Sequence, residues 1–190
     1  MFRYNQFMVI AMLTMYAVFS ACNGGEKKQD SKDIAEERNN AKFSEGEKFD
    51  ADFMVDVADI VLCEIMLSQT AIEKGAMQFT KDYAAKMIEA HNKIYTDLKS
   101  IAESKSITIP QNLSAEGEDT FGSIAKKDGN KFDEEYCEHM IDSHKTTIVK
   151  FERAAKEAYD SEIKSWAQNL LPQLRIDLDA AYACEDAHKK

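Results

Sequence analysis

The sequence contains few turn-forming residues and comparatively little positive charge. Seven glycines and two prolines among 190 residues are too few for the many tight turns of a β-sandwich or β-barrel. Lysine and arginine total 24 against 34 aspartate and glutamate residues, which gives a formal net charge of −10. Because binding to phosphates requires an excess of basic residues, this balance argues against nucleic acid as a partner.

Motifs of the common catalytic classes are missing as well. The sequence has no glycine-rich phosphate loop, no nucleophile elbow and no paired-cysteine zinc motif. This argues against the common nucleotide enzymes and hydrolases. Whether the protein is an enzyme of another kind stays open at this point.

The one long apolar run lies at the N-terminus. Phe7–Phe19 follows Arg3 and leads into Ser20-Ala21-Cys22. A basic start, a short apolar segment and small residues before a cysteine are typical of a lipoprotein signal peptide, so we predict removal of residues 1–21 and acylation of Cys22. Ordinary signal cleavage near Ala21, with Cys22 unmodified, is the alternative. Because two acyl chains anchor a protein stably, we expect a lipid-anchored protein of the bacterial cell envelope. The outer membrane is the favoured location, with the protein facing the periplasm.

The segment after the predicted acylation site is highly polar. Thirteen of the 26 residues over 23–48 are charged, and the few apolar ones show no sustained helical period. Such a segment buries too little apolar surface to offset the entropy of ordering it. We therefore predict that residues 22–48 are an acylated cysteine followed by a flexible tether, and that the folded domain covers residues 49–188.

From Phe49 onward, apolar residues recur at the alternating three- and four-residue spacing of packed helices. Four such runs occur: Phe53, Val57, Ile60, Leu67 and Ala71; Ala84, Met87, Ile94, Leu98 and Ile101; Cys137, Met140, Thr147 and Phe151; and Ile163, Leu170, Leu174, Ala181 and Cys184. The connection over residues 104–131 is long and has room for a short helix near 114–127. We predict an all-α fold, a ferritin-like four-helix bundle with a long crossover between the second and third helices.

Each apolar run is interrupted near its middle by one ionisable residue. These residues are Glu64, His91, His144 and Asp177. A residue at mid-helix stays at mid-height whichever way its helix runs, so we expect all four in one layer. Residues 83–102 and 136–155 also resemble each other in sequence, which places the two histidines in equivalent surroundings.

Two interpretations of this layer remain open. Two imidazoles and two carboxylates suit a divalent metal such as iron, manganese or zinc, with copper ranking behind them. Alternatively, two protonated histidines and two carboxylates form a buried polar network that fixes helix register. The glutamate three residues before histidine, typical of di-iron centres, is missing, which argues against a ferritin-type ferroxidase.

The cysteines give a second structural prediction. Cys137 lies seven residues before His144, and Cys184 lies seven after Asp177. On antiparallel neighbouring helices these steps lead to the same end of the bundle, so a Cys137–Cys184 disulfide is expected in an oxidising compartment. Cys63 would then be free and buried. Three unpaired thiols are the alternative.

The folded part of the sequence resembles the bacterial ferritin-like "domain of unknown function 4142" family. The matching stretches include Glu64-Ile65-Met66-Leu67, Met87-Ile88-Glu89-Ala90-His91, Ile109-Pro110, Phe132-Asp133-Glu134-Glu135-Tyr136, Met140-Ile141-Asp142-Ser143-His144 and Leu171-Pro172-Gln173-Leu174. The resemblance implies a ferritin-like bundle and an exported protein, and it brings no established activity. In this family the position of Asp177 is commonly histidine, whereas Glu64, His91 and His144 match the family pattern.

Two functional hypotheses follow from the sequence. In the first, a lipid-anchored envelope protein binds a metal or protects against stress through the Glu64, His91, His144 and Asp177 layer. In the second, the protein is a structural or interaction lipoprotein, and the layer is only a buried polar network.

Overall fold

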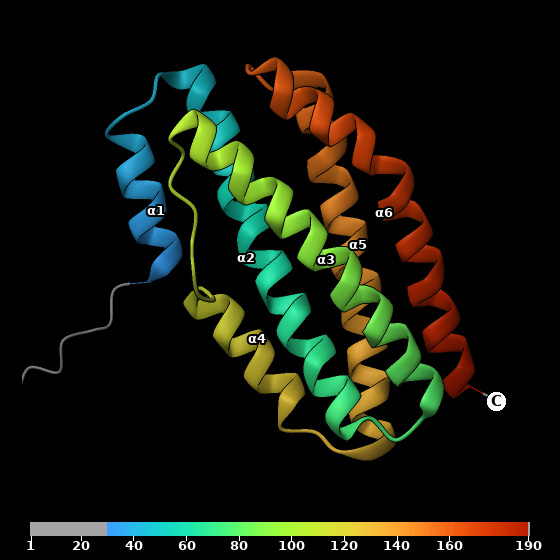
Figure 1. Ribbon diagram of the computed structural model, residues 1–190. Coiled ribbons are helices and arrows are strands. Elements are labelled where there is room, and N and C mark those ends of the chain that lie inside the picture. The colour runs from blue at the N-terminus through green and yellow to red at the C-terminus, as the bar shows by residue number, and fades with distance from the viewer. Residues whose placement is uncertain (1–29, 190) are drawn as a thin grey trace, which may run out of the picture.

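The computed structural model describes residues 30–189, and within them it contains six helices and no strand. The helices are α1 (Ser31–Asn40), α2 (Glu45–Lys74), α3 (Gln78–Lys105), α4 (Ala115–Ala125), α5 (Gly129–Glu157) and α6 (Ser161–His188) (Figure 1). The predicted all-α class is confirmed for this part of the chain. None of these helices is both long enough and apolar enough to span a membrane. The predicted signal peptide and Cys22 lie outside the described residues.

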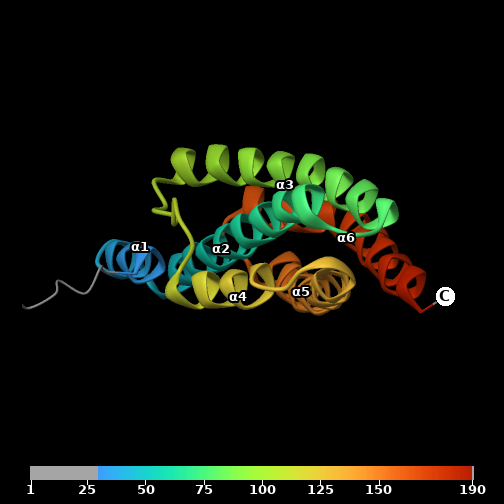
Figure 2. The same ribbon diagram turned by 90° about the horizontal axis from the view of Figure 1, so that it is seen from below.

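The four long helices form two antiparallel hairpins, α2–α3 and α5–α6. The hairpins pack against each other through α2 on α5 and α3 on α6. Figure 2 shows α3 and α5 on opposite sides of α2. The segment between the hairpins runs back along α2 and carries α4, which packs on α2 and α5 (Figure 1). Helix α6 continues through Pro172.

The apolar core is divided into two clusters along the helices. One cluster is built around Phe53, Phe151 and Trp166, whose rings contact each other at centroid distances of 5.1–6.0 Å. The other is built around Phe132 and Tyr136, which are stacked at 6.1 Å. On α3, α5 and α6 the interrupting ionisable residue lies between the parts that enter the two clusters, and on α2 the two parts meet around Glu64. The polar layer therefore separates the two halves of the core.

The α2–α3 turn is held by a buried aspartate from the other hairpin. Asp133 accepts hydrogen bonds from the backbone N–H groups of Ala76 and Met77, at 3.0 and 2.8 Å. A Cβ atom on Gly75 would lie 2.6 Å from the Ala71 carbonyl oxygen and 2.9 Å from the Asp133 carboxylate. Only glycine allows so close an approach at this turn.

The prediction of a flexible tether over residues 22–48 is wrong for its described part, residues 30–48. Helix α1 packs on α2, and α2 itself begins at Glu45 behind a capping box formed by Ser44 and Glu47. The Asn39 side chain is buried and both donates to and accepts from the backbone of Thr108, each at 2.8 Å. This segment is ordered by long-range polar contacts. Such contacts produce no periodic pattern of apolar residues, so the sequence pattern does not reveal them.

Candidate metal centre

Three of the four interrupting residues converge in the middle of the domain. Glu64 on α2, His91 on α3 and His144 on α5 are each at most 2% exposed. One ligand atom of each lies within 4.8 Å of the other two. His91 Nε2 is 2.6 Å from Glu64 Oε2, His144 Nδ1 is 3.7 Å from Glu64 Oε1, and the two imidazole rings are 5.5 Å apart. Three helices thus contribute nitrogen and oxygen donors to one dry site.

The two histidines are held in the same way by their own helices. His91 Nδ1 donates to the Met87 carbonyl oxygen, and His144 Nδ1 donates to the Met140 carbonyl oxygen, both at 2.7 Å. Because a carbonyl oxygen only accepts hydrogen bonds, Nδ1 carries the proton in each ring. In a neutral imidazole, Nε2 is then the lone-pair nitrogen that can bind a metal. The equivalent surroundings expected from the internal similarity are present.

Electrostatics favours a charged pair at the centre. Burial alone would raise the pKa of Glu64, but the imidazoles of His91 and His144 hold it at about 2. Burial alone would lower the pKa of His91, but the adjacent Glu64 carboxylate overrides this effect and raises it. A proton therefore lies between His91 Nε2 and Glu64 Oε2. Such a pair is tolerated in a dry core because each charge is the partner of the other.

Two donor atoms at the centre have no hydrogen-bond partner in the protein. They are Glu64 Oε1 and His144 Nε2. Buried polar groups are normally paired, because an unpaired one costs about 1–3 kcal/mol. An unpaired oxygen of an ionised carboxylate and an unpaired imidazole nitrogen are suited to bind a cation.

Asp177 is buried but is not part of the group that converges on one point. Its Oδ1 accepts a hydrogen bond from Gln173 Nε2 at 2.9 Å, one turn earlier on α6, and its Oδ2 has no partner. The carboxylate is near enough to contribute to the raised pKa of His91. The structure therefore brings together three of the four residues predicted as ligands and places the fourth beside them.

The comparisons with known proteins identify the family of this domain. The family model described as "Domain of unknown function (DUF4142)" matches residues 35–183. The chain belongs to this family. The match begins inside α1 and ends in α6, so residues 35–40 of α1 fall within the family domain. No curated protein and no solved structure matches the chain.

A surface cavity of about 320 Å³ between α2, α4 and α5 approaches the centre from one side. Its lining includes Cys63, His139 and Ser143. Cys63 and Ser143 are the sequence neighbours of Glu64 and His144, so the cavity wall lies next to the centre. The buried Nε2 of His139 has no hydrogen-bond partner. The spacing of apolar residues could not single out His139, because it lies off the seam of α5.

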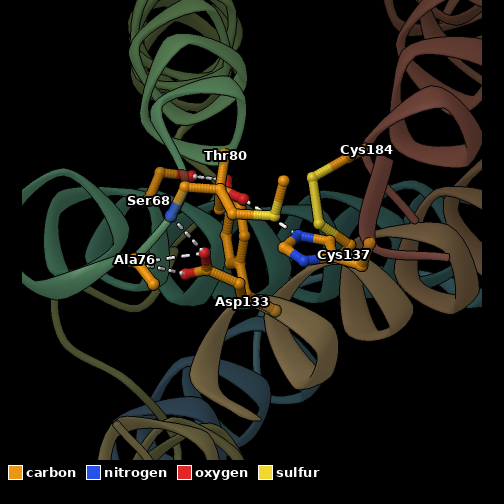
Figure 3. The surroundings of a disulfide bond; sticks show 9 residues. Ser68, Ala76, Thr80, Asp133, Cys137 and Cys184 are labelled. Carbon is orange, nitrogen blue, oxygen red and sulfur yellow. Dashed lines mark hydrogen bonds between the residues drawn. A yellow bond between two sulfur atoms is a disulfide. The ribbon is translucent and has the colours of Figure 1, made fainter. Parts of the chain in front are cut away.

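Cys137 and Cys184, predicted as a pair, are joined by a disulfide between α5 and α6. Figure 3 shows this disulfide beside Thr80 at the end of the domain where Asp133 holds the α2–α3 turn. Cys63 is a free, buried cysteine. Its sulfur contacts the Gly117 carbonyl oxygen at 3.9 Å.

Proposed function

We propose that this protein is a lipid-anchored envelope protein whose Glu64, His91 and His144 bind one divalent transition metal ion. Its role would be metal binding, storage or protection against stress, rather than rapid turnover of a substrate. We further propose that the two hairpins form a ferritin-like bundle around this ion. The proposal goes beyond the family assignment, which brings no activity.

The observation that carries the proposal is the anchoring of both imidazoles. A metal-binding histidine commonly donates its second ring nitrogen to a carbonyl oxygen, which fixes the ring and the tautomer. His91 and His144 both do so, at 2.7 Å. A register network does not require both rings to be anchored through Nδ1, an arrangement that leaves Nε2 of each ring as the nitrogen that binds a metal once it carries no proton.

The donor set favours iron, manganese or zinc over copper. Imidazole nitrogen and carboxylate oxygen suit these ions, whereas the thioethers of Met87 and Met140, which would favour copper(I), belong to the apolar core. The unpaired Oδ2 of Asp177 could supply a fourth donor after a side-chain rotation. Access from the cavity lined by Ser143 would let the ion reach the centre.

Calorimetric titration of the full chain with Mn²⁺, Fe²⁺, Zn²⁺ and Cu⁺, after treatment with a chelator, tests the proposal. We expect one ion per chain and a raised melting temperature for at least one of the first three metals. His91→Gln and His144→Gln should each weaken binding by roughly tenfold or more, which is about 1.4 kcal/mol. His139→Gln is the matched control, because it removes a half-buried imidazole of α5 outside the group. The absence of heat and of any melting shift with every metal overturns the proposal.

The lipid anchor is a separate part of the proposal. The Ser20-Ala21-Cys22 sequence supports acylation at Cys22 and a position at the outer membrane, facing the periplasm. Expressed in a bacterium, the wild-type chain should partition into detergent and lack residues 1–21, whereas Cys22→Ser should stay in the aqueous phase. An aqueous wild-type chain that begins elsewhere excludes the anchor.

One observation favours the alternative of a structural or interaction lipoprotein. The 2.6 Å contact between His91 Nε2 and Glu64 Oε2 already pairs two of the donors without a metal. Under this alternative, His91→Gln lowers the free energy of unfolding, and no ion binds the wild-type chain. The metal titration described above separates the two functions.

A further inference from the structure

We propose that the Cys137–Cys184 disulfide conceals a second metal site, which opens on reduction and takes Zn²⁺ or a similarly thiophilic ion. The third ligand is His188, near the end of α6. This site is separate from the centre around Glu64, because Cys137 lies seven residues, or about 10 Å of helix, before His144. The inference does not depend on the proposed function of that centre.

The three residues converge on one point. One ligand atom each of Cys137, Cys184 and His188 lies within 4.8 Å of the other two. His188 Nε2 is held 3.0 Å from the Thr80 hydroxyl at the start of α3. A disulfide alone needs no imidazole beside it, so the fixed histidine is the feature that points to a ligand set. Two cysteines and a histidine are a common zinc donor set that leaves a fourth position for water or another ligand.

The backbone permits the conversion from disulfide to metal site. The Cα atoms of Cys137 and Cys184 are 5.7 Å apart. Once the sulfur–sulfur bond is broken, rotation about each Cα–Cβ bond can separate the sulfurs around an ion whose bonds to sulfur are about 2.3 Å. Both cysteines lie inside long helices, so these rotations require no change of fold.

The outer side of the site is acidic and open. A surface cavity of about 260 Å³ is lined by Glu134, Glu138, Glu185, His188 and Lys189. Three carboxylates against one lysine attract cations to this end of the domain. The cavity reaches His188, which is only partly buried. It thus gives a metal ion a route to the histidine of the site. Both cysteines are fully buried and do not line the cavity, so a reductant reaches the disulfide when the end of α6 opens locally.

The redox step balances with a dithiol as reductant, as supplied by a dithiol–disulfide exchange protein. The dithiol transfers two electrons and two protons to the Cys137–Cys184 disulfide, which yields two thiols and an oxidised dithiol. Binding of Zn²⁺ then releases both thiol protons and forms two zinc–thiolate bonds. Re-oxidation by the disulfide form of such an exchange protein, which takes up two electrons and two protons and becomes a dithiol, re-forms the Cys137–Cys184 bond and releases the ion.

The test uses the full chain carrying Glu64→Gln, so that the central group does not contribute. The chain is reduced with a water-soluble phosphine in the absence of oxygen and titrated with Co²⁺, a coloured substitute for zinc. We expect one Co²⁺ per reduced chain, a thiolate-to-cobalt absorption band, and loss of this band on adding Zn²⁺. The oxidised chain should show no band.

Variants assign the ligands. Cys184→Ser should abolish the band, and His188→Ala should weaken Co²⁺ binding by roughly tenfold or more. Cys63→Ala and His139→Ala should leave it unchanged. The proposal is overturned if the reduced chain gives no band, or if the band survives in Cys184→Ser. If reduction unfolds the chain, Zn²⁺ must restore helical circular dichroism with intact His188 and not in His188→Ala; failure to restore it also overturns the proposal.

Discussion

Asp50 and Asp133 make the same kind of contact: each accepts hydrogen bonds from the turn of the hairpin to which the other belongs. Asp50, near the start of α2, accepts hydrogen bonds from the N–H groups of Tyr159 and Asp160 at 2.9 and 2.6 Å, in the α5–α6 turn. Asp133, near the start of α5, accepts from Ala76 and Met77 in the α2–α3 turn. In both turns the second donor is the N-cap residue of the following helix. Each hairpin therefore fixes the turn of the other, which sets the height at which Glu64, His91 and His144 meet.

Removing either carboxylate should destabilise the domain. Asp50 and Asp133 are at most 3% exposed, and their loss leaves backbone N–H groups without an acceptor. We expect Asp133→Ala and Asp50→Ala each to lower the free energy of unfolding by about 2 kcal/mol, measured by urea denaturation. Asp142→Ala, an exposed aspartate of α5, is the control and should change stability by less than about 0.5 kcal/mol. Equal midpoints for Asp133→Ala and Asp142→Ala would contradict the clamping role.

The two buried carboxylates of the central layer should differ in their effect on stability. Glu64→Ala leaves two imidazoles without their partner, so we expect the metal-free protein to lose about 3–5 kcal/mol. Asp177→Asn keeps an acceptor for Gln173 and should cost less than about 1 kcal/mol. Urea denaturation in the presence of a chelator measures both. A larger loss of stability for Asp177→Asn than for Glu64→Ala would show that Asp177, and not Glu64, is the main stabilising carboxylate of the layer.

The sequence predicts the long helices well because their stability comes from one repeated feature. Apolar residues at three- and four-residue spacing mark the buried side of α2, α3, α5 and α6, and a single polar residue in each seam stands out against them. The convergence of Glu64, His91 and His144 follows from their mid-helix positions. Asp177 fits the same pattern, yet the sequence does not show that Gln173 occupies one of its oxygens.

Helix α1 could not be predicted in this way. Only Ala35 and Asn39 are buried along it, so it has no apolar seam. It is ordered by contacts to residues far along the chain, such as those of Asn39 to Thr108 and Lys32 to Asp56. The spacing of apolar residues does not reveal polar contacts of this kind. The charged composition of the segment, taken alone, therefore predicts disorder.

The attachment of α1 should depend on pH through Asp56. This carboxylate pairs with Lys32 of α1 and Lys150 of α5. Burial alone would raise the pKa of Asp56, but the two ammonium groups override this and lower it. A lowered pKa in the folded state means that the stabilisation is present above the ordinary value of 3.8 and is lost as the pH falls through the folded-state pKa.

Asp56→Asn should therefore be less stable than the wild type by about 1–2 kcal/mol at pH 7. The difference should shrink as the pH falls below about 4. Thermal unfolding of both chains over this range measures it. Asp142→Asn, whose carboxylate is exposed, provides the comparison at each pH. A difference between Asp56→Asn and wild type that does not change with pH would exclude the ion pairs as its cause.

The free thiol of Cys63 should be almost unreactive in the folded protein. Burial raises the pKa of Cys63 to about 12, and only the thiolate is nucleophilic. At pH 8 roughly one thiol in 10⁴ is then ionised. In a Cys22→Ser chain with the disulfide intact, an aromatic disulfide reagent should react only after denaturant is added. Rapid labelling of the folded chain would show that Cys63 is accessible through the cavity it lines.

The Cys137–Cys184 disulfide should contribute substantially to stability even without any metal. It closes a loop with a sequence separation of 47 residues between α5 and α6, and cross-linking a loop of this length lowers the entropy of the unfolded chain. The chain-entropy model gives about 4 kcal/mol for the effect. Urea denaturation of the wild type and of Cys184→Ser, both with a chelator present, measures the loss. Cys63→Ser is a poor match because it alters the core, so the reduced wild-type chain serves as the second comparison. If Cys184→Ser and the reduced chain unfold at the wild-type midpoint, α5 and α6 are held by their packing alone.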